Sequence, residues 1–228
     1  MNKPFAIVLH SGGLDSTTCL AIAAADGYQP HALAFNYGQR HRYELEAAKR
    51  ICEQRGIPQT LLHLPINQLG GSALTDHAQA IPTHTGSHEI PTTYVPARNL
   101  TFLSYAVGLA EVLKAEAIYI GVSAIDYSGY PDCRPEFIES FAKTANLATK
   151  AGVEGKQLLL KTPLITLSKA QTIQWGYRLG VDYAETVSCY QANKQGAACG
   201  YCDSCVLRKN GFANAGLPDS TRYEATLP

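Results

Sequence analysis

The chain has 228 residues, of which 46% are hydrophobic, so it is long enough to bury the core of one domain with a small appendage. Lysine plus arginine equals aspartate plus glutamate at 19 each, and this zero net charge argues against a protein that binds nucleic acid. No apolar run approaches the ~20 residues of a membrane span, and the N-terminus is unlike a signal peptide. We therefore expect a cytoplasmic protein whose seven cysteines are thiols or metal ligands.

Strand-like and helix-like stretches alternate along most of the chain. This alternation predicts an α/β fold, in which helices cover both faces of a parallel sheet. Ligands of such sheets bind at the carboxyl ends of the strands, near a switch in strand order. The expected strands are Phe5–Leu9, His31–Phe35, Thr60–Leu64, Ala117–Gly121 and Gln157–Lys161. The expected helices are Asp15–Ala25, Tyr43–Arg55, Asn99–Leu113, Pro135–Lys150 and Ser168–Leu179.

A glycine turn follows the first strand, at Ser11-Gly12-Gly13. A strand, a glycine turn and a helix in succession form an anion site, because the backbone can approach a ligand closely and the first helical N–H groups have no internal partner. Ser11 and Ser16 add hydroxyl donors, and Asp15 adds a carboxylate that can hold magnesium. The simpler interpretation is an ordinary turn in which Asp15 or Ser16 caps the helix.

The longer string Ser-Gly-Gly-x-Asp-Ser resembles the PP-loop of the ATP pyrophosphatase superfamily, and it lacks the Gly-Lys-Ser/Thr ending of a Walker A loop. The resemblance implies cleavage of ATP between its α and β phosphates and adenylation of a substrate oxygen. Asp15, Ser16 and Arg98 are the candidate catalytic residues. The stretch expected to bind ATP comprises His10, Ser11, Gly12, Gly13, Leu14, Asp15, Ser16, Thr17, Thr18, Cys19 and Leu20.

Two further polar segments adjoin the expected pocket. Arg40 or His41, after the second strand, can approach a phosphate, although a plain polar turn explains them equally well. Arg98 stands at the start of an apolar helix whose candidate N-cap is Asn99, and it can bind a polyphosphate or a substrate carboxylate. The alternative is a surface arginine.

The segment from Pro65 to Pro96 is long and rich in glycine, serine, threonine, histidine and proline. Such segments are usually lids or disordered, and we expect a lid that orders partly when ligand binds. Its histidines, His77, His84 and His88, are expected to be solvated and not to bind a metal.

The loop after the fourth strand combines aromatic rings, carboxylates and an arginine between glycines and prolines. Aromatic rings can stack on a planar substrate and carboxylates can accept from its N–H groups, which suits a purine-like ring. Cys133 is an improbable nucleophile, because adenylation needs no thiol. The candidate substrate residues are Asp126, Tyr127, Tyr130, Asp132 and Arg134.

Four cysteines lie near the end of the chain as one distal residue followed by Cys-x-x-Cys-x-x-Cys. They are Cys189, Cys199, Cys202 and Cys205. Four thiolates at this spacing can surround one tetrahedral ion, which favours a closed structural zinc site. An iron–sulfur cluster is the alternative metal centre.

Together these motifs resemble the 7-cyano-7-deazaguanine synthase family of queuosine biosynthesis. The resemblance rests on residues 10–19, 36–41, 95–99, 126–133, 188–189 and 199–205, in order over nearly the whole chain. It implies a ligase that converts 7-carboxy-7-deazaguanine and ammonia into a nitrile through an adenylated acid and an adenylated amide, with ATP, zinc and magnesium. It also implies a homodimer, and with no glutaminase domain we expect free ammonia as the nitrogen source.

We therefore expect an ATP-binding α/β domain over residues 1–187 and a zinc-binding segment over residues 188–228 packed on it. Other functions remain open at this point. One is another adenylating PP-loop enzyme, such as a tRNA thiolase or an amide ligase. The other is a zinc module without catalytic activity that binds a nucleotide or a partner.

Overall fold

The computed structural model describes residues 3–40, 42–84, 89–123 and 130–224. One sheet of five parallel strands runs through its centre in the order β3-β2-β1-β4-β5. Leu9 at the end of β1 pairs with Leu33 of β2, and Val8 pairs with Tyr119 of β4, so strand order switches beside β1. The strands are β1 (Phe5–Leu9), β2 (Gln29–Asn36), β3 (Gln59–His63), β4 (Ala117–Tyr119) and β5 (Leu159–Lys161).

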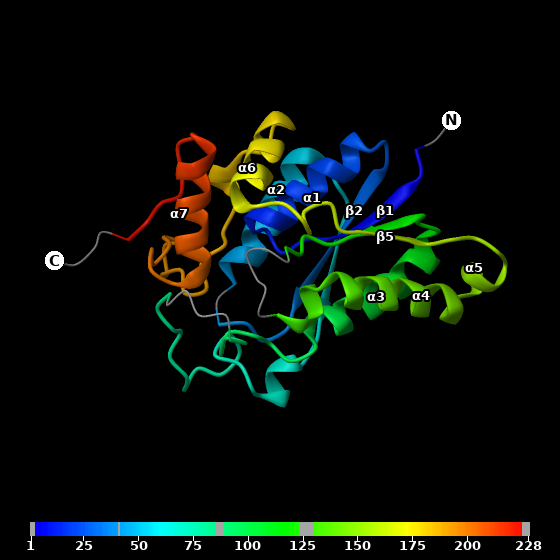
Figure 1. The fold of residues 1–228 in the computed structure, drawn as a ribbon, viewed down its shortest axis with the longest axis horizontal. Helices are drawn as coiled ribbons and strands as arrows, with labels where there is room; N and C mark the ends of the chain where they lie inside the picture. The colour runs from blue at the N-terminus through cyan, green and yellow to red at the C-terminus, as the bar shows by residue number, and fades with distance from the viewer. Residues whose placement is uncertain (1–2, 41, 85–88, 124–129, 225–228) are drawn as a thin grey trace.

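Helices cover both faces of the sheet, as Figure 1 shows. On one face lie α1 (Leu14–Ala25), α2 (Tyr43–Arg55) and α6 (Lys169–Arg178), and on the other α3 (Arg98–Leu113) and α4 (Pro135–Ala148). The side chains of β1 alternate between the two cores: Ala6 and Val8 pack on the α1 side, and Ile7 and Leu9 pack on the α3 side. The predicted α/β fold with a parallel sheet is confirmed.

The predicted elements exist, with shifts at their ends. The strand expected to continue to Gly121 stops at Tyr119, and the one expected to start at Gln157 starts at Leu159. The predicted helix Pro135–Lys150 is wrong at its end, because Thr149 has an extended backbone (φ −110°, ψ 149°) and its side chain caps the short helix α5 (Lys150–Val153). Ser168 caps α6 as expected, in a capping box with Gln171.

Besides α5, four elements of the described residues have no counterpart in the expectations. They are η1 (Ile66–Leu69), η2 (Pro131–Cys133), η3 (Tyr183–Glu185) and the C-terminal helix α7 (Asp203–Ala215). Helix α7 packs against α6, so the end of the chain returns to the carboxyl-end side of the sheet (Figure 1). None of the helices among these residues is both long and apolar enough to cross a membrane.

The described part of the segment from Pro65 to Pro96 packs on the main core, and its movement as a lid stays a prediction. Ala73, Leu74, Ile81 and Val95 are buried in the main core. His84 contacts the cysteine-rich segment, where its Nδ1 lies 2.8 Å from Asp203 Oδ1. His88 lies outside the described residues.

Candidate active site

The glycine turn closes on itself through the two serines that flank it. The Ser11 N–H donates to Ser16 Oγ at 3.2 Å, and Ser16 Oγ donates to the Gly13 carbonyl at 3.1 Å. Gly12 has φ +84°, and a Cβ there would lie 2.2 Å from the carbonyl oxygen of Glu44. Only glycine therefore permits this approach between the turn and α2.

The turn forms the floor of a cavity of about 220 Å³ at the carboxyl ends of β1, β2 and β4. From the predicted ATP-binding stretch, this cavity is lined by His10, Ser11, Gly13, Leu14, Asp15 and Ser16. Gly12 packs under α2, as described above. The next four residues, Thr17, Thr18, Cys19 and Leu20, are buried in the interior of α1. The predicted ATP-binding stretch therefore has two parts: residues that line the cavity, and residues buried in α1 beneath the cavity.

Asp15 forms an ion pair that the sequence did not suggest. Both of its carboxylate oxygens accept from Lys169 Nζ, at 2.7 and 2.8 Å. Lys169 is the first residue of α6, and only 7% of its side chain is exposed. Both residues line the cavity, so the pair presents a lysine ammonium beside the phosphate turn.

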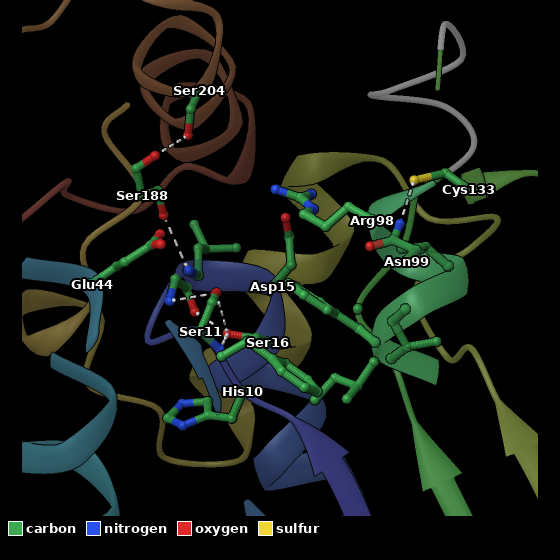
Figure 2. A pocket seen from close by; sticks show the side chains of 18 of the residues that line it. His10, Ser11, Asp15, Ser16, Glu44, Arg98, Asn99, Cys133, Ser188 and Ser204 are labelled. Carbon is green, nitrogen blue, oxygen red and sulfur yellow. Dashed lines mark hydrogen bonds between the residues drawn. The ribbon is translucent and has the colours of Figure 1, made fainter. Parts of the chain in front are cut away.

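Arg98 enters the cavity from the start of α3 (Figure 2). Its Nη1 donates to the Tyr37 hydroxyl at 3.3 Å, and its guanidinium carbon lies 5.8 Å from the centre of that ring. Ala97 precedes it with φ +54°, a region that alanine rarely adopts, so the chain carries backbone strain where it presents the arginine. Burial raises the pKa of Tyr37 to about 12, which keeps its hydroxyl neutral.

Asn99 is not the N-cap of α3, as the sequence suggested. The cap position belongs to Ala97, which makes no side-chain cap bond, and Asn99 is buried in the first turn. The Asn99 backbone N–H donates to Asp132 Oδ2 at 2.9 Å, and its side-chain amide donates to the Asp132 carbonyl at 3.3 Å. A carboxylate from the loop after β4 thus supplies the negative charge that a helix N-terminus favours.

Only some of the predicted substrate residues line the cavity. Tyr130 lines the cavity, and its hydroxyl lies 2.9 Å from Thr93 Oγ1. Asp132 instead holds the start of α3, and Arg134 is exposed at the start of α4, away from the cavity lining. Asp126 and Tyr127 lie outside the described residues.

Arg40, which the sequence suggested as a phosphate ligand, has a different role. It donates to the carbonyls of Asp76, His77 and Gln79, so it binds the Pro65–Pro96 segment. His41 lies outside the described residues.

Burial shifts the pKa values of three further titratable groups that line the cavity. Burial, with the charge of Arg55, lowers the pKa of His10 to about 4. Burial raises the pKa of Glu44 to about 7, against the opposing effects of Arg98 and of the amide of Gln39. Burial also raises the pKa of Cys133 to about 12, so this thiol is protonated and is a poor nucleophile.

The four predicted metal ligands come together. The Sγ atoms of Cys189, Cys199, Cys202 and Cys205 all lie within 4.8 Å of one another, and all four residues are buried. The Cys199 N–H donates to Cys189 Sγ at 3.2 Å, and the Cys202 N–H approaches Cys199 Sγ at 3.5 Å. Four clustered sulfurs, of which those of Cys189 and Cys199 accept backbone N–H groups, fit a tetrahedral metal such as zinc.

The cysteine cluster is joined to the phosphate turn by a short stretch of backbone. The Val187 N–H donates to the Gly12 carbonyl at 3.0 Å, and Ser188 Oγ accepts from the Leu14 N–H at 3.1 Å. Ser204 Oγ donates to the Ser188 carbonyl, at 2.6 Å. Since Ser188 precedes Cys189 and Ser204 precedes Cys205, a metal held by these cysteines also fixes the residues over the turn.

Sequence reasoning missed several residues of the cavity, among them Glu44, Lys169, Ser188, Ser204 and Arg208. Glu44 and Lys169 each lie in the first turn of a correctly predicted helix, and helix starts point toward the carboxyl ends of the strands in such folds. Their positions at helix starts could therefore have identified Glu44 and Lys169 as cavity residues from the sequence. Ser204 and Arg208 had no such signal, because α7 itself was not expected.

Comparisons with known proteins show the family of the chain. A family model described as "Queuosine biosynthesis protein QueC" matches residues 5–216. A 7-cyano-7-deazaguanine synthase of Saccharophagus degradans is 60% identical over 224 residues, which cover 98% of this chain and 99% of that protein. One from Pseudomonas paraeruginosa is also 60% identical, over 98% of this chain and 100% of that protein. Among solved structures, a 4-thiouridine synthetase–RNA complex with bound ATP has a TM-score of 0.50 at 17% identity, over 96% of this chain and 47% of that one, a likeness of fold alone.

Proposed function

The chain belongs to the QueC family and its activity is that of a 7-cyano-7-deazaguanine synthase, an ATP-dependent ligase of queuosine biosynthesis; from this premise we propose how its residues carry the reaction. The substrates are 7-carboxy-7-deazaguanine, ammonia and ATP. The observation that carries the proposal is the phosphate turn at the switch in strand order, with the Asp15–Lys169 pair beside it. This arrangement suits cleavage of ATP next to its α phosphate.

ATP lies with its phosphates over the turn. The hydroxyl groups of Ser11 and Ser16 and the start of α1 face the phosphate oxygens, and Lys169 stabilises the negative charge that grows on the departing pyrophosphate. The buried residues Thr17 to Leu20 hold α1 in place and make no contact with the nucleotide. Thr18, for example, donates to the Leu14 carbonyl at 2.9 Å and lies 2.8 Å from the Tyr183 hydroxyl.

The deazaguanine ring occupies the aromatic end of the same cavity. Tyr37, Phe102 and Tyr130 line that end, and Phe35 and Phe102 stack with their centroids 4.0 Å apart. Such walls suit a flat heteroaromatic ring. Arg98, held by Tyr37 between the aromatic end and the turn, orients the substrate carboxylate for attack on the α phosphorus.

Two metal ions have separate roles in the proposal. The four cysteines would hold zinc, and the bound ion would stabilise the backbone around Ser188 and Ser204. Asp15 would hold magnesium together with phosphate oxygens and water, since this ion typically uses one or two carboxylates. Magnesium, when bound, neutralises phosphate charge.

The same residues take part in both adenylation steps of the reaction. In the first half, the carboxylate is adenylated with release of pyrophosphate, and ammonia displaces AMP to give the primary amide. In the second half, the amide oxygen is adenylated, and loss of AMP and a proton leaves the nitrile. Cys133, protonated and hydrogen-bonded by the Asn99 amide at 3.4 Å, takes no covalent part.

The order of events is tested by offering the acid and the amide separately and counting AMP by chromatography. The acid with ammonium should give two AMP for each nitrile. The amide should give one AMP for each nitrile without any ammonium, because only the second adenylation remains. An enzyme that stops at the amide is an ordinary amide ligase, and release of ADP and phosphate alone would contradict the PP-loop chemistry.

A further inference from the structure

Formation of the amide requires a proton acceptor that the proposed function does not supply. Ammonia in water at neutral pH is almost entirely ammonium, which has no lone pair with which to attack. The group that takes its proton must reach the reacting carbon and must be a base near neutral pH. Among the described residues that line the cavity, the carboxylates are Asp15 and Glu44.

Asp15 is a poor acceptor for this proton. Both of its oxygens already accept hydrogen bonds from the Lys169 ammonium, at 2.7 and 2.8 Å. His10 also lines the cavity, but it is 1% exposed, and its ring nitrogens face Thr17 Oγ1 at 3.2 Å and Cys52 Sγ at 3.6 Å. Asp15 is thus committed to Lys169 and, in the proposed function, to magnesium, and His10 to Thr17 and Cys52, so neither residue is placed to take a proton from ammonium.

A hydrogen bond to one oxygen orients the Glu44 carboxylate and leaves its other oxygen available. It lies in the first turn of α2, and its Oε1 accepts from the Gln39 side-chain amide at 3.2 Å. That amide is itself fixed, because it donates to the Phe35 carbonyl at 3.2 Å and its oxygen accepts from the Tyr37 N–H at 2.8 Å. No hydrogen bond among the described residues involves Glu44 Oε2.

The backbone places Glu44 beside the phosphate turn. Its carbonyl lies against Gly12 of the phosphate turn, at the distance where no Cβ fits. Figure 2 shows its side chain on one side of the turn, with Arg98 on the other side and Ser188 above. Glu44 and Arg98 therefore enter the cavity from opposite sides of the turn, and the proposed function holds the substrate carboxylate between Arg98 and the turn.

We propose that Glu44 binds ammonium and accepts one of its protons in the amide-forming step, an inference that rests on the proposed function. The proton passes to Glu44, the freed nitrogen lone pair forms the C–N bond at the acyl carbon of the adenylate, and the C–O bond to AMP breaks. A second proton leaves to water as the amide becomes neutral. The carboxyl of Glu44 then loses its proton to solvent.

The charged and titratable groups around Glu44 suit this role. Arg98 lies on α3, Tyr37 follows β2, and Asp15, Lys169 and Arg208 line the cavity from α1, α6 and α7. With a pKa of about 7, Glu44 is half ionised at neutral pH and accepts and returns a proton readily. Its negative form also attracts ammonium into a cavity that is otherwise rich in cationic side chains.

The test compares Glu44→Gln with the wild type in two partial reactions. Exchange of pyrophosphate into ATP, dependent on the acid and without ammonium, reports adenylation, in which no nitrogen takes part. We expect Glu44→Gln to keep this exchange within about threefold. Amide formation with ammonium should fall about 100-fold or more, the usual contribution of a general base.

Each other outcome has a defined meaning. Equal loss of exchange and amide formation would mean that Glu44 binds ATP or the ring, and retention of both would mean that it has no role; either result overturns the proposal. Wild-type exchange without any amide would refute the proposed function and not the assignment of Glu44. Circular dichroism and the melting temperature check folding, and Glu44→Asp, which keeps a shorter carboxylate, should fall between the two.

A neighbouring carboxylate gives the matched control. Glu46 lies two residues further along α2, is exposed, and lines a separate cavity. Glu46→Gln should leave both partial reactions unchanged. Hydroxylamine, which is largely neutral at neutral pH, should restore acyl transfer in Glu44→Gln more than ammonium does, and an equal defect with both nucleophiles would contradict proton acceptance by Glu44.

Discussion

At the scale of single residues, His10 links burial to the pH dependence of stability. Its pKa is about 4 in the folded chain, against an unfolded value near 6.5, so the unfolded chain binds a proton more readily between these values. The free energy of unfolding should therefore be unaffected above pH 6.5 and should fall by about 3 kcal/mol as pH decreases to 4. Urea unfolding at several pH values measures this loss, which His10→Gln should reduce. His31→Gln is the control, because burial lowers its pKa less; equal slopes in all three proteins would exclude His10 as the group.

At the scale of elements, we expect α7 and the backbone before it to depend on a metal. The helix begins at Asp203, directly after Cys202, and it carries Cys205 of the four-cysteine cluster in its first turn. Binding of a structural zinc contributes directly to folding. Cys202→Ala should therefore lose about one zinc per chain, measured by elemental analysis, and should melt at a lower temperature. Cys52→Ala, a buried cysteine outside the cluster, should keep its zinc. A brown protein with visible absorption bands would instead indicate an iron–sulfur cluster.

At the scale of the whole molecule, the cysteine segment should unfold together with the sheet. The four cysteines belong to the same core cluster as Ile7 and Leu103, and the Val187 N–H bonds the Gly12 carbonyl. Urea unfolding followed by fluorescence of Trp175, on α6, should coincide with zinc release followed by a chromogenic chelator. Two separated transitions would mean that residues 1–187 and 188–228 are independent domains. The homodimer remains a prediction, which sedimentation velocity can measure.

The sequence by itself determined the class of fold and the chemistry of its two strongest motifs. Local patterns carry this information: apolar strands alternate with amphipathic helices, the string from Ser11 to Ser16 has the composition of a phosphate turn, and the cysteine spacing fixes a four-sulfur cluster. Helix α7 was not predicted, because this stretch was interpreted only through the metal-binding spacing of its cysteines. Its helical pattern is present nonetheless: the buried residues are spaced as on one side of a helix, at Ser204, Cys205, Arg208, Gly211 and Phe212.

Tertiary structure alone decided which of the expected residues meet in the cavity. Lys169 is separated from Asp15 by more than half the chain, and Glu44 meets Gly12 only because β2 pairs beside β1. Local sequence specifies which side of a helix is apolar, but it does not specify which charged residues from distant elements line the same cavity. Asp132 illustrates the same limit: its loop suggested contact with a substrate, whereas packing turns its carboxylate toward the N-terminus of α3, where a helix start requires an acceptor.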